Sequence, residues 1–153
     1  MATRREKPLA SLDTESVLPL HQSGTCIYRG NIIADKEFIR IDDYSPYLAQ
    51  DKVDFYERCR LYAIIDAHGH PTIGSFIKLA LPIVLAQSLS HALFPGEITQ
   101  NFVLKAMLQA FTQLDRDFCI DNPASDEGCS VVAVFVCGDG MFVASCGDSQ
   151  VCD

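Results

Sequence analysis

An aspartate and two histidines follow a run of apolar residues in the segment LYAIIDAHGHPT, residues 61–72. Asp66, His68 and His70 offer carboxylate oxygens and imidazole nitrogens, which divalent metals use as ligands, and an imidazole can also transfer a proton. At the end of a buried strand, an unpaired carboxylate would lose about 3 kcal/mol or more of hydration. We therefore expect Asp66 to have a bound cation, an arginine or backbone N–H groups as its partner. The plain structural alternative is an aspartate that caps the next helix, with both histidines on the surface.

The elements that must position these residues follow the order strands, two helices, strands. Continuous apolar runs indicate strands buried on both faces, and apolar residues at every fourth position indicate an amphipathic helix. The predicted strands are 27–41, with a turn or break at 34–36, then 61–65, 130–137 and 141–146, and the predicted helices are about 75–93 and 97–118. The last two strands form a hairpin about Gly138-Asp139-Gly140. This order predicts an α+β fold with helices on a mostly antiparallel sheet and a second sheet behind it.

Composition limits the classes of protein and partner. With 153 residues, 48% of them hydrophobic, and a net charge of −8, the chain is expected to be one soluble domain that binds no nucleic acid. Its seven cysteines include no C-x-x-C pair, which indicates reduced core thiols and a cytoplasmic or nuclear setting rather than a zinc knuckle. The apolar window 73–94 is interrupted by polar residues and Pro82, so we expect a buried helix and no membrane span. Residues 1–23 lack the apolar core of a secretory signal and are interpreted as a mobile segment.

Two families contain a string similar to IIDAHGHP. The D-x-H-x-H pattern resembles the zinc-binding motif of amidohydrolases. In that family, however, the motif opens a long barrel of strand–helix units with further histidines. Here only His91 follows His70, and two helices and a hairpin come next.

The second resemblance is to the metal-dependent protein serine/threonine phosphatases of the PP2C (PPM) type, whose strand-ending motif is D-G-H-G-G. Asp66-Ala67-His68-Gly69-His70 matches it at three of five positions. Residues 128–150, GCSVVAVFVCGDGMFVASCGDSQ, resemble the family's G-[SC]-T-A-x-x-A and D-G-x-L-x-V-A-N-x-G-D-S-R blocks, and residues 110–118 resemble its A-F-x-x-x-D-x-x-F helix end. Three ordered blocks are more specific than one motif. The resemblance covers residues 24–153, which we interpret as a partial PP2C-like domain.

The resemblance implies an α-β-β-α sandwich and a two-metal site for Mg²⁺ or Mn²⁺. Such cations prefer oxygen ligands, lower the pKa of bound water and neutralise a transferring phosphoryl group, and in this family the metal-bound hydroxide attacks phosphorus. The implied metal ligands are Asp66, which bridges the cations, Ala67 through its carbonyl, Asp35 and Asp148. His68 would be the general acid, and Arg29 would bind phosphate.

Several positions depart from the family pattern. His70 replaces a glycine, Ala34 stands where an acidic or amide residue is usual, and Arg29 lies six residues before Asp35 rather than five. The S-D-G segment and the late D-N pair, which follow the G-D-S block in that family, are not found after Gly147-Asp148-Ser149 in this sequence. We therefore expect an incomplete metal set and an incompletely covered sheet that favours self-association.

The function favoured by these observations is hydrolysis of phosphoserine and phosphothreonine in protein substrates, with weak catalysis by this chain alone. The alternative is a non-catalytic PP2C-like module, a pseudophosphatase that binds partners. A zinc amidohydrolase is a distant third.

Overall fold

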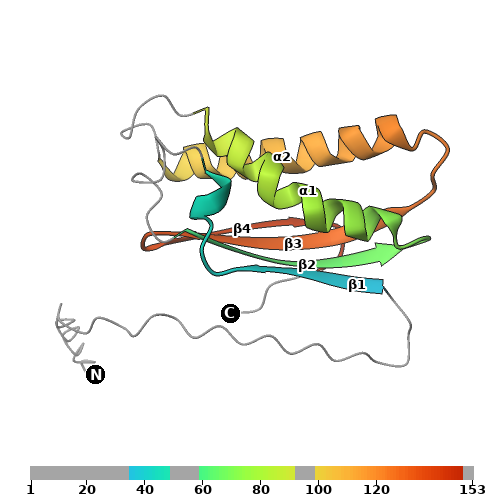
Figure 1. Cartoon of the computed structure of the whole chain (residues 1–153), viewed down its shortest axis with the longest axis horizontal. Helices are drawn as coiled ribbons and strands as arrows, with labels where there is room; N and C mark the ends of the chain where they lie inside the picture. Colours follow the sequence, from blue (N-terminus) through green and yellow to red (C-terminus); the bar gives the residue numbers. More distant parts are fainter. Residues whose placement is uncertain (1–34, 49–58, 92–98, 150–153) are drawn as a thin grey trace, which may run out of the picture. The chain divides into compact units, whose positions relative to one another are not determined.

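The computed structural model describes residues 35–48, 59–91 and 99–149. Its elements are β1 (Asp35–Ile41), the short 3-10 turn η1 (Ser45–Tyr47), β2 (Arg60–His68), α1 (Thr72–Leu89), α2 (Gln100–Asp121), β3 (Gly128–Cys137) and β4 (Gly140–Cys146). The strands form one antiparallel sheet in the order β1-β2-β3-β4, and both helices lie on the same face of it (Figure 1). The predicted α+β fold and the hairpin are therefore confirmed.

The sheet has two unlike faces because successive side chains of a strand point in opposite directions. In β2, Leu61 and Ile65 are fully buried on the face that carries the helices, whereas Ile64 between them is 58% exposed. We call the opposite side the open face. From the strand register, its members are Lys36, Phe38 and Arg40 of β1, Arg60, Tyr62, Ile64, Asp66 and His68 of β2, Gly128, Ser130, Val132, Val134 and Val136 of β3, and Met141, Val143 and Ser145 of β4.

The expectation that residues 61–65 are buried on both faces is wrong for the described part of the chain. The residues are apolar without alternation, yet they alternate in burial, since the helices cover one side only. The described residues hold this one sheet, so the second sheet expected behind it is not among them. At the other side of β2, Asp35 and Lys36 begin β1 instead of forming a turn or break, and the earlier part of that predicted segment lies outside the described residues.

Helix α1 begins at Thr72 and ends at Leu89, so the predicted bounds of about 75–93 are wrong at both ends. The backbone N–H of Ile73 donates to Oε2 of Glu127, a residue distant in sequence, and this bond caps the first turn. At the other end, the N–H of Ser90 donates to the carbonyls of Ala86 and Gln87 and closes the helix. Residues 94–96, expected to stop the helix, lie outside the described residues.

The interior of α1 is packed into the domain. By length and composition α1 could cross a membrane, but 56% of its residues are buried among the sheet and α2, as in the core helix of a globular domain. Pro82 lies inside the helix, and its carbonyl accepts a hydrogen bond from the buried hydroxyl of Tyr44. Burial raises the pKa of Tyr44, so the hydroxyl stays protonated and donates.

Helix α2 runs three residues later than predicted at each end, from Gln100 to Asp121 against 97–118. The side chain of Thr99 accepts the N–H of Phe102 at 3.2 Å and starts the helix there. The expected stripe is confirmed. Its buried members are Val103, Ala106, Met107, Ala110, Leu114 and Phe118.

Candidate functional site

Asp66 lies on the open face, close to the end of β2, and its partner is a lysine. Lys36 stands directly opposite it in the ladder with β1, and Lys36 Nζ lies 3.1 Å from Asp66 Oδ2. The Asp66 side chain is 32% exposed, so its carboxylate remains partly hydrated. Lysine was not among the partners expected for Asp66, and Arg29, the arginine implied by the resemblance, lies outside the described residues. The capping alternative is wrong, because Glu127 caps α1.

His68 follows on the same face and packs on a glycine of the neighbouring strand. Gly128 of β3 is its cross-strand partner, and a Cβ atom built on Gly128 would lie 2.4 Å from His68 Nε2. Real Cβ contacts are never that short, so any other residue at position 128 would displace the imidazole. The glycine that opens the G-C-S block therefore leaves the space that the His68 ring occupies.

Ser130 lies on the other side of Asp66 from Lys36. It is the partner of Asp66 in the β2–β3 ladder, it is buried, and its Oγ is 2.6 Å from Oγ of Ser149. Gly147, with φ +89°, packs so closely that a Cβ there would lie 2.5 Å from Ser130 Cβ. These contacts hold the segment that follows β4 against Ser130, next to Asp66. The exposed Asp148 belongs to this segment.

The remaining residues expected at the site are placed as follows. Ala67 is buried on the helix-bearing face, so it could reach a ligand on the open face only through its backbone. Asp35 begins β1 opposite Ala67, but its side chain and the whole of Arg29 lie outside the described part. His70 is exposed, with Nδ1 2.8 Å from Oγ1 of Thr72, and so serves the turn into α1.

The open face therefore brings together a row of side chains across three strands at the C-terminal end of β2. The row is Lys36, Asp66 and Ser130, with His68 and Gly128 next to it. Sequence reasoning found Asp66 and His68 but missed Lys36 and Ser130. The alternation of Lys36 with Phe38 in a strand indicated that the two side chains share one face of the sheet. The sequence did not indicate the register that places Lys36 opposite Asp66.

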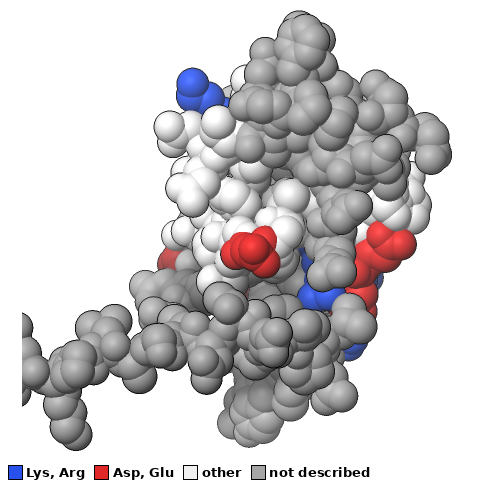
Figure 2. Space-filling model, turned by 90° about the vertical axis from the view of Figure 1, so that its left-hand side faces the viewer, with Lys and Arg blue, Asp and Glu red and all other residues white. Residues whose placement is uncertain are grey.

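At the opposite end of the sheet, where β2 begins, the polar contacts are formed by Arg40, Asp42 and Tyr62. β2 ends at His68 at the tip of its arrow in Figure 1, and Figure 2 faces the opposite end, where acidic and basic side chains lie beside one another. There Asp42 binds Arg40 Nε at 2.9 Å and accepts the hydroxyl of Tyr62, also at 2.9 Å. The bond from Tyr62 joins β2 to the residue that directly follows β1, and the bond from Arg40 is local to that segment.

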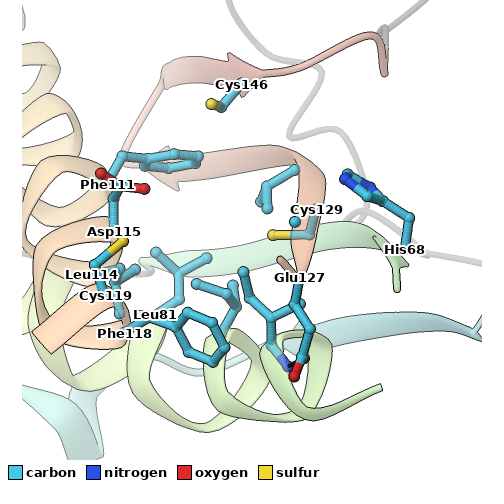
Figure 3. Close-up of a pocket in the computed structure, with 14 residues that line it drawn as sticks. His68, Leu81, Phe111, Leu114, Asp115, Phe118, Cys119, Glu127, Cys129 and Cys146 are labelled. Carbon is cyan, nitrogen blue, oxygen red and sulfur yellow. Dashed lines mark hydrogen bonds between the residues drawn. The ribbon is translucent and has the colours of Figure 1, made fainter. Parts of the chain in front are cut away.

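A cavity of about 240 Å³ lies between the two helices and the sheet. Figure 3 shows Phe111, Leu114 and Phe118 entering it from α2, with Cys129 and Cys146 opposite. Burial, followed by the charges of Cys146 and Asp115, raises the pKa of Cys129, so this thiol is protonated at neutral pH. The walls are mostly apolar, and the cavity touches the row on the open face only through His68 and Gly128.

The cysteines only partly fit the interpretation as core thiols. Cys59 is buried, but Cys119 and Cys146 are exposed, and the five cysteines in the described residues are all free thiols. Cys26 and Cys152 lie outside the described residues.

Metal ligands are few in the described residues. Within 35–48, 59–91 and 99–149, no three His, Cys, Asp or Glu side chains gather closely enough to hold a metal ion. Asp66 offers one carboxylate, and Lys36 already occupies one of its oxygens. These residues alone do not fit two divalent cations, which require several oxygen ligands.

Comparison with known proteins gives one finding. The family model described as Protein phosphatase 2C matches residues 46–152, which include β2, both helices and the hairpin. A search among curated proteins found no match. One antiparallel sheet with two helices on one face is consistent with part of a domain of that family.

Proposed function

The chain belongs to the protein phosphatase 2C family, and on that premise we propose that it hydrolyses phosphoserine and phosphothreonine in protein substrates, with Asp66 at the centre of the site. The observation that carries the proposal is the position of Asp66. It lies on the open face at the end of β2, about one-third exposed, with the Lys36 ammonium, a hydroxyl and an imidazole as neighbours. The domain does not use this carboxylate to cap a helix, and its pair with Lys36 leaves it partly exposed to solvent.

The proposal includes Mg²⁺ or Mn²⁺ as cofactor, from the family resemblance. Bound cations of this kind would supply charge neutralisation for a phosphoryl group. Asp66 contributes one hard oxygen ligand of the type such cations prefer. The described residues do not complete the set, so further carboxylates would have to join Asp66. The resemblance offers Asp35 and Asp148, and Asp148 belongs to the segment that Ser149 joins to Ser130, the cross-strand neighbour of Asp66.

His68 is proposed to hold the proton that the leaving serine or threonine oxygen needs. The imidazole is exposed on the open face, and Gly128, which has no side chain, leaves room for the ring in this position. Proton transfer requires a group within hydrogen-bond reach of the leaving oxygen. A substrate phosphate beside Asp66 would place its ester oxygen near His68, since the two residues are neighbours on one face of β2.

The second candidate function is a non-catalytic PP2C-like module, and one contact favours it. Lys36 neutralises Asp66 at 3.1 Å, as a residue that replaces a metal ion would do. The amidohydrolase alternative has lost its support, because an antiparallel sheet in the order β1-β2-β3-β4 is not the start of a parallel barrel.

The partners proposed for either function are proteins. Phosphoprotein substrates follow from the family. Self-association is proposed through the open face, where the large apolar side chains of Ile64 and Met141 are 58% and 68% exposed. A cytoplasmic or nuclear location stays a proposal from the cysteine content.

The test is release of phosphate from a phosphothreonine peptide by the full chain in the presence of Mn²⁺. We expect turnover that is lost in Asp66→Ala and retained in Asp139→Ala. Asp139 is the matched control because it is an exposed aspartate in the hairpin turn, at the opposite end of the sheet. Turnover that is no greater for the native chain than for Asp66→Ala would reject the catalytic proposal and leave the binding module.

A further inference from the structure

Cys59 and Cys137 face each other where β2 begins and β3 ends. The β2–β3 ladder pairs Arg60 with Val136, so one further step along the two strands sets Cys59 opposite Cys137. Both thiols belong to the helix-bearing face, because side chains alternate along a strand and Arg60 and Val136 belong to the open face. Cys59 is 1% exposed, and Cys137 is half-buried against the same core. Two thiols that are distant in sequence therefore share one part of the core.

The backbone holds both cysteines in place. The N–H of Tyr44 donates to the carbonyl of Cys59 at 2.9 Å, and Cys137 is the partner of Gly140 in the ladder with β4. Residues directly opposite each other on antiparallel strands have Cα atoms about 4.5–5.5 Å apart. Disulfides join Cα atoms that are about 4.4–6.8 Å apart. A bond between the two sulfurs is therefore compatible with the strands in their present positions.

The two thiols are already in contact, and they differ in acidity. A hydrogen bond between them lowers the pKa of Cys137 and, together with burial, raises the pKa of Cys59. Cys59 is thus the donor, and Cys137 is the thiol that more readily becomes a thiolate, the form that reacts with oxidants. Cys137 is also the more accessible of the two, since it directly precedes the exposed hairpin turn at Gly138. An oxidant from solution would therefore react with Cys137 first, with Cys59 within reach of the product.

The other described cysteines are not arranged in this way. Cys146 stands opposite Val131 in the β3–β4 ladder, so Cys129, two positions earlier, is only its diagonal neighbour. Cys119 is exposed and lies in α2 rather than in the sheet. In the part of the chain that the structure describes, the pair at the start of β2 is therefore the one in which two cysteines are directly opposed on adjacent strands.

We propose that Cys59 and Cys137 are a redox modification site, which hydrogen peroxide converts into a cross-strand disulfide and a dithiol restores. The Cys137 thiolate attacks one oxygen of the peroxide, the O–O bond breaks, and the other oxygen leaves as hydroxide. The Cys59 sulfur then attacks the sulfur of the resulting sulfenic acid, the S–O bond breaks, and the oxygen leaves as water with the proton of Cys59. The two sulfurs lose two electrons in all, which the peroxide takes up. Neither step involves Asp66 or depends on the proposed phosphatase activity.

The experiment is treatment of the full chain with hydrogen peroxide, followed by alkylation of the remaining thiols and peptide mapping by mass spectrometry. We expect an intramolecular link between Cys59 and Cys137, with a mass loss of about 2 Da for the two hydrogens removed, and its disappearance after treatment with dithiothreitol. This link should form at least about tenfold faster than any other, since a thiolate in contact with its partner thiol reacts fastest.

Single variants test each cysteine of the pair. Cys137→Ser should remove the link, and Cys59→Ser should leave Cys137 as a sulfenic acid, which dimedone captures. Cys119→Ser is the matched control, because it removes an exposed thiol of α2 and should keep the link. Circular dichroism reports whether each variant keeps the fold, and the peptide map of the native chain decides the question without them.

Three results would overturn the proposal. The first is a dominant link between other cysteines in the native chain. The second is oxidation of Cys137 while Cys59 remains a free thiol. The third is loss of the link in a folded Cys119→Ser chain.

Discussion

Replacing Glu127 by alanine should destabilise the domain more than replacing Asp66. Glu127 Oε2 accepts the N–H of Ile73 at 3.0 Å, and Pro71, which precedes the helix, provides no side-chain cap. Loss of a cap costs about 1 kcal/mol, and loss of a carboxylate at a helix N-terminus costs about 0.3–1 kcal/mol more. We therefore expect the free energy of unfolding to fall by about 1.5 kcal/mol in Glu127→Ala.

Three companion variants divide this value into its causes. Glu127→Gln keeps an oxygen acceptor without the charge, so it should lose only about 0.5 kcal/mol. Asp126→Ala changes the exposed neighbouring carboxylate and should have an effect of less than about 0.5 kcal/mol. Asp66→Ala removes an exposed ion pair with Lys36 and should cost about 0–1 kcal/mol.

The assay is urea denaturation of each variant, followed by circular dichroism. The informative result is a clearly lower free energy of unfolding for Glu127→Ala than for Asp66→Ala, because it separates a residue that stabilises α1 from a residue that contributes little to stability. A loss in Asp66→Ala as large as the loss in Glu127→Ala would refute the reasoning, since Asp66 would then be a structural residue.

Two further predictions concern the imidazole and a thiol. Gly128→Ala should displace the ring of His68 and so lower turnover of the phosphothreonine peptide by about 10²-fold, the same loss expected for His68→Ala. An unchanged rate in Gly128→Ala would contradict a requirement for this ring position. A hydrogen bond with Cys137, and then burial, raise the pKa of Cys59, which keeps this thiol protonated and unreactive at neutral and mildly alkaline pH. Mass spectrometry after iodoacetamide treatment of the native chain should therefore find Cys119, which is exposed, modified and Cys59 unmodified. Equal modification of the two would contradict this.

Features encoded by neighbouring residues could be predicted from the sequence. The hairpin follows from Gly138-Asp139-Gly140 between apolar runs, and its strands agree with the structure to within two residues. The course of α2 follows from its four-residue period, and Thr99 sets its first turn. In both cases the chemistry that defines the element lies inside it or beside it.

Features that depend on distant residues could not be predicted. The first turn of α1 is capped by Glu127, so no pattern near Thr72 fixed its start. The partner of Asp66 is Lys36, which the register of β1 against β2 places there. The apolar run in β2 also concealed its alternation, because Ile64 faces away from the helices while its neighbours pack against them.

The most direct test of the account is the rate of phosphate release from a phosphothreonine peptide by the full chain in Mn²⁺, compared with the Asp66→Asn variant. Asn is close to Asp in size, so the fold and the neighbouring Ser130 and His68 should be kept while the negative charge is lost. The account predicts that the native chain turns over and that Asp66→Asn loses the rate by at least about 10²-fold. Equal rates for the two chains would contradict the assignment of Asp66 as the centre of the site.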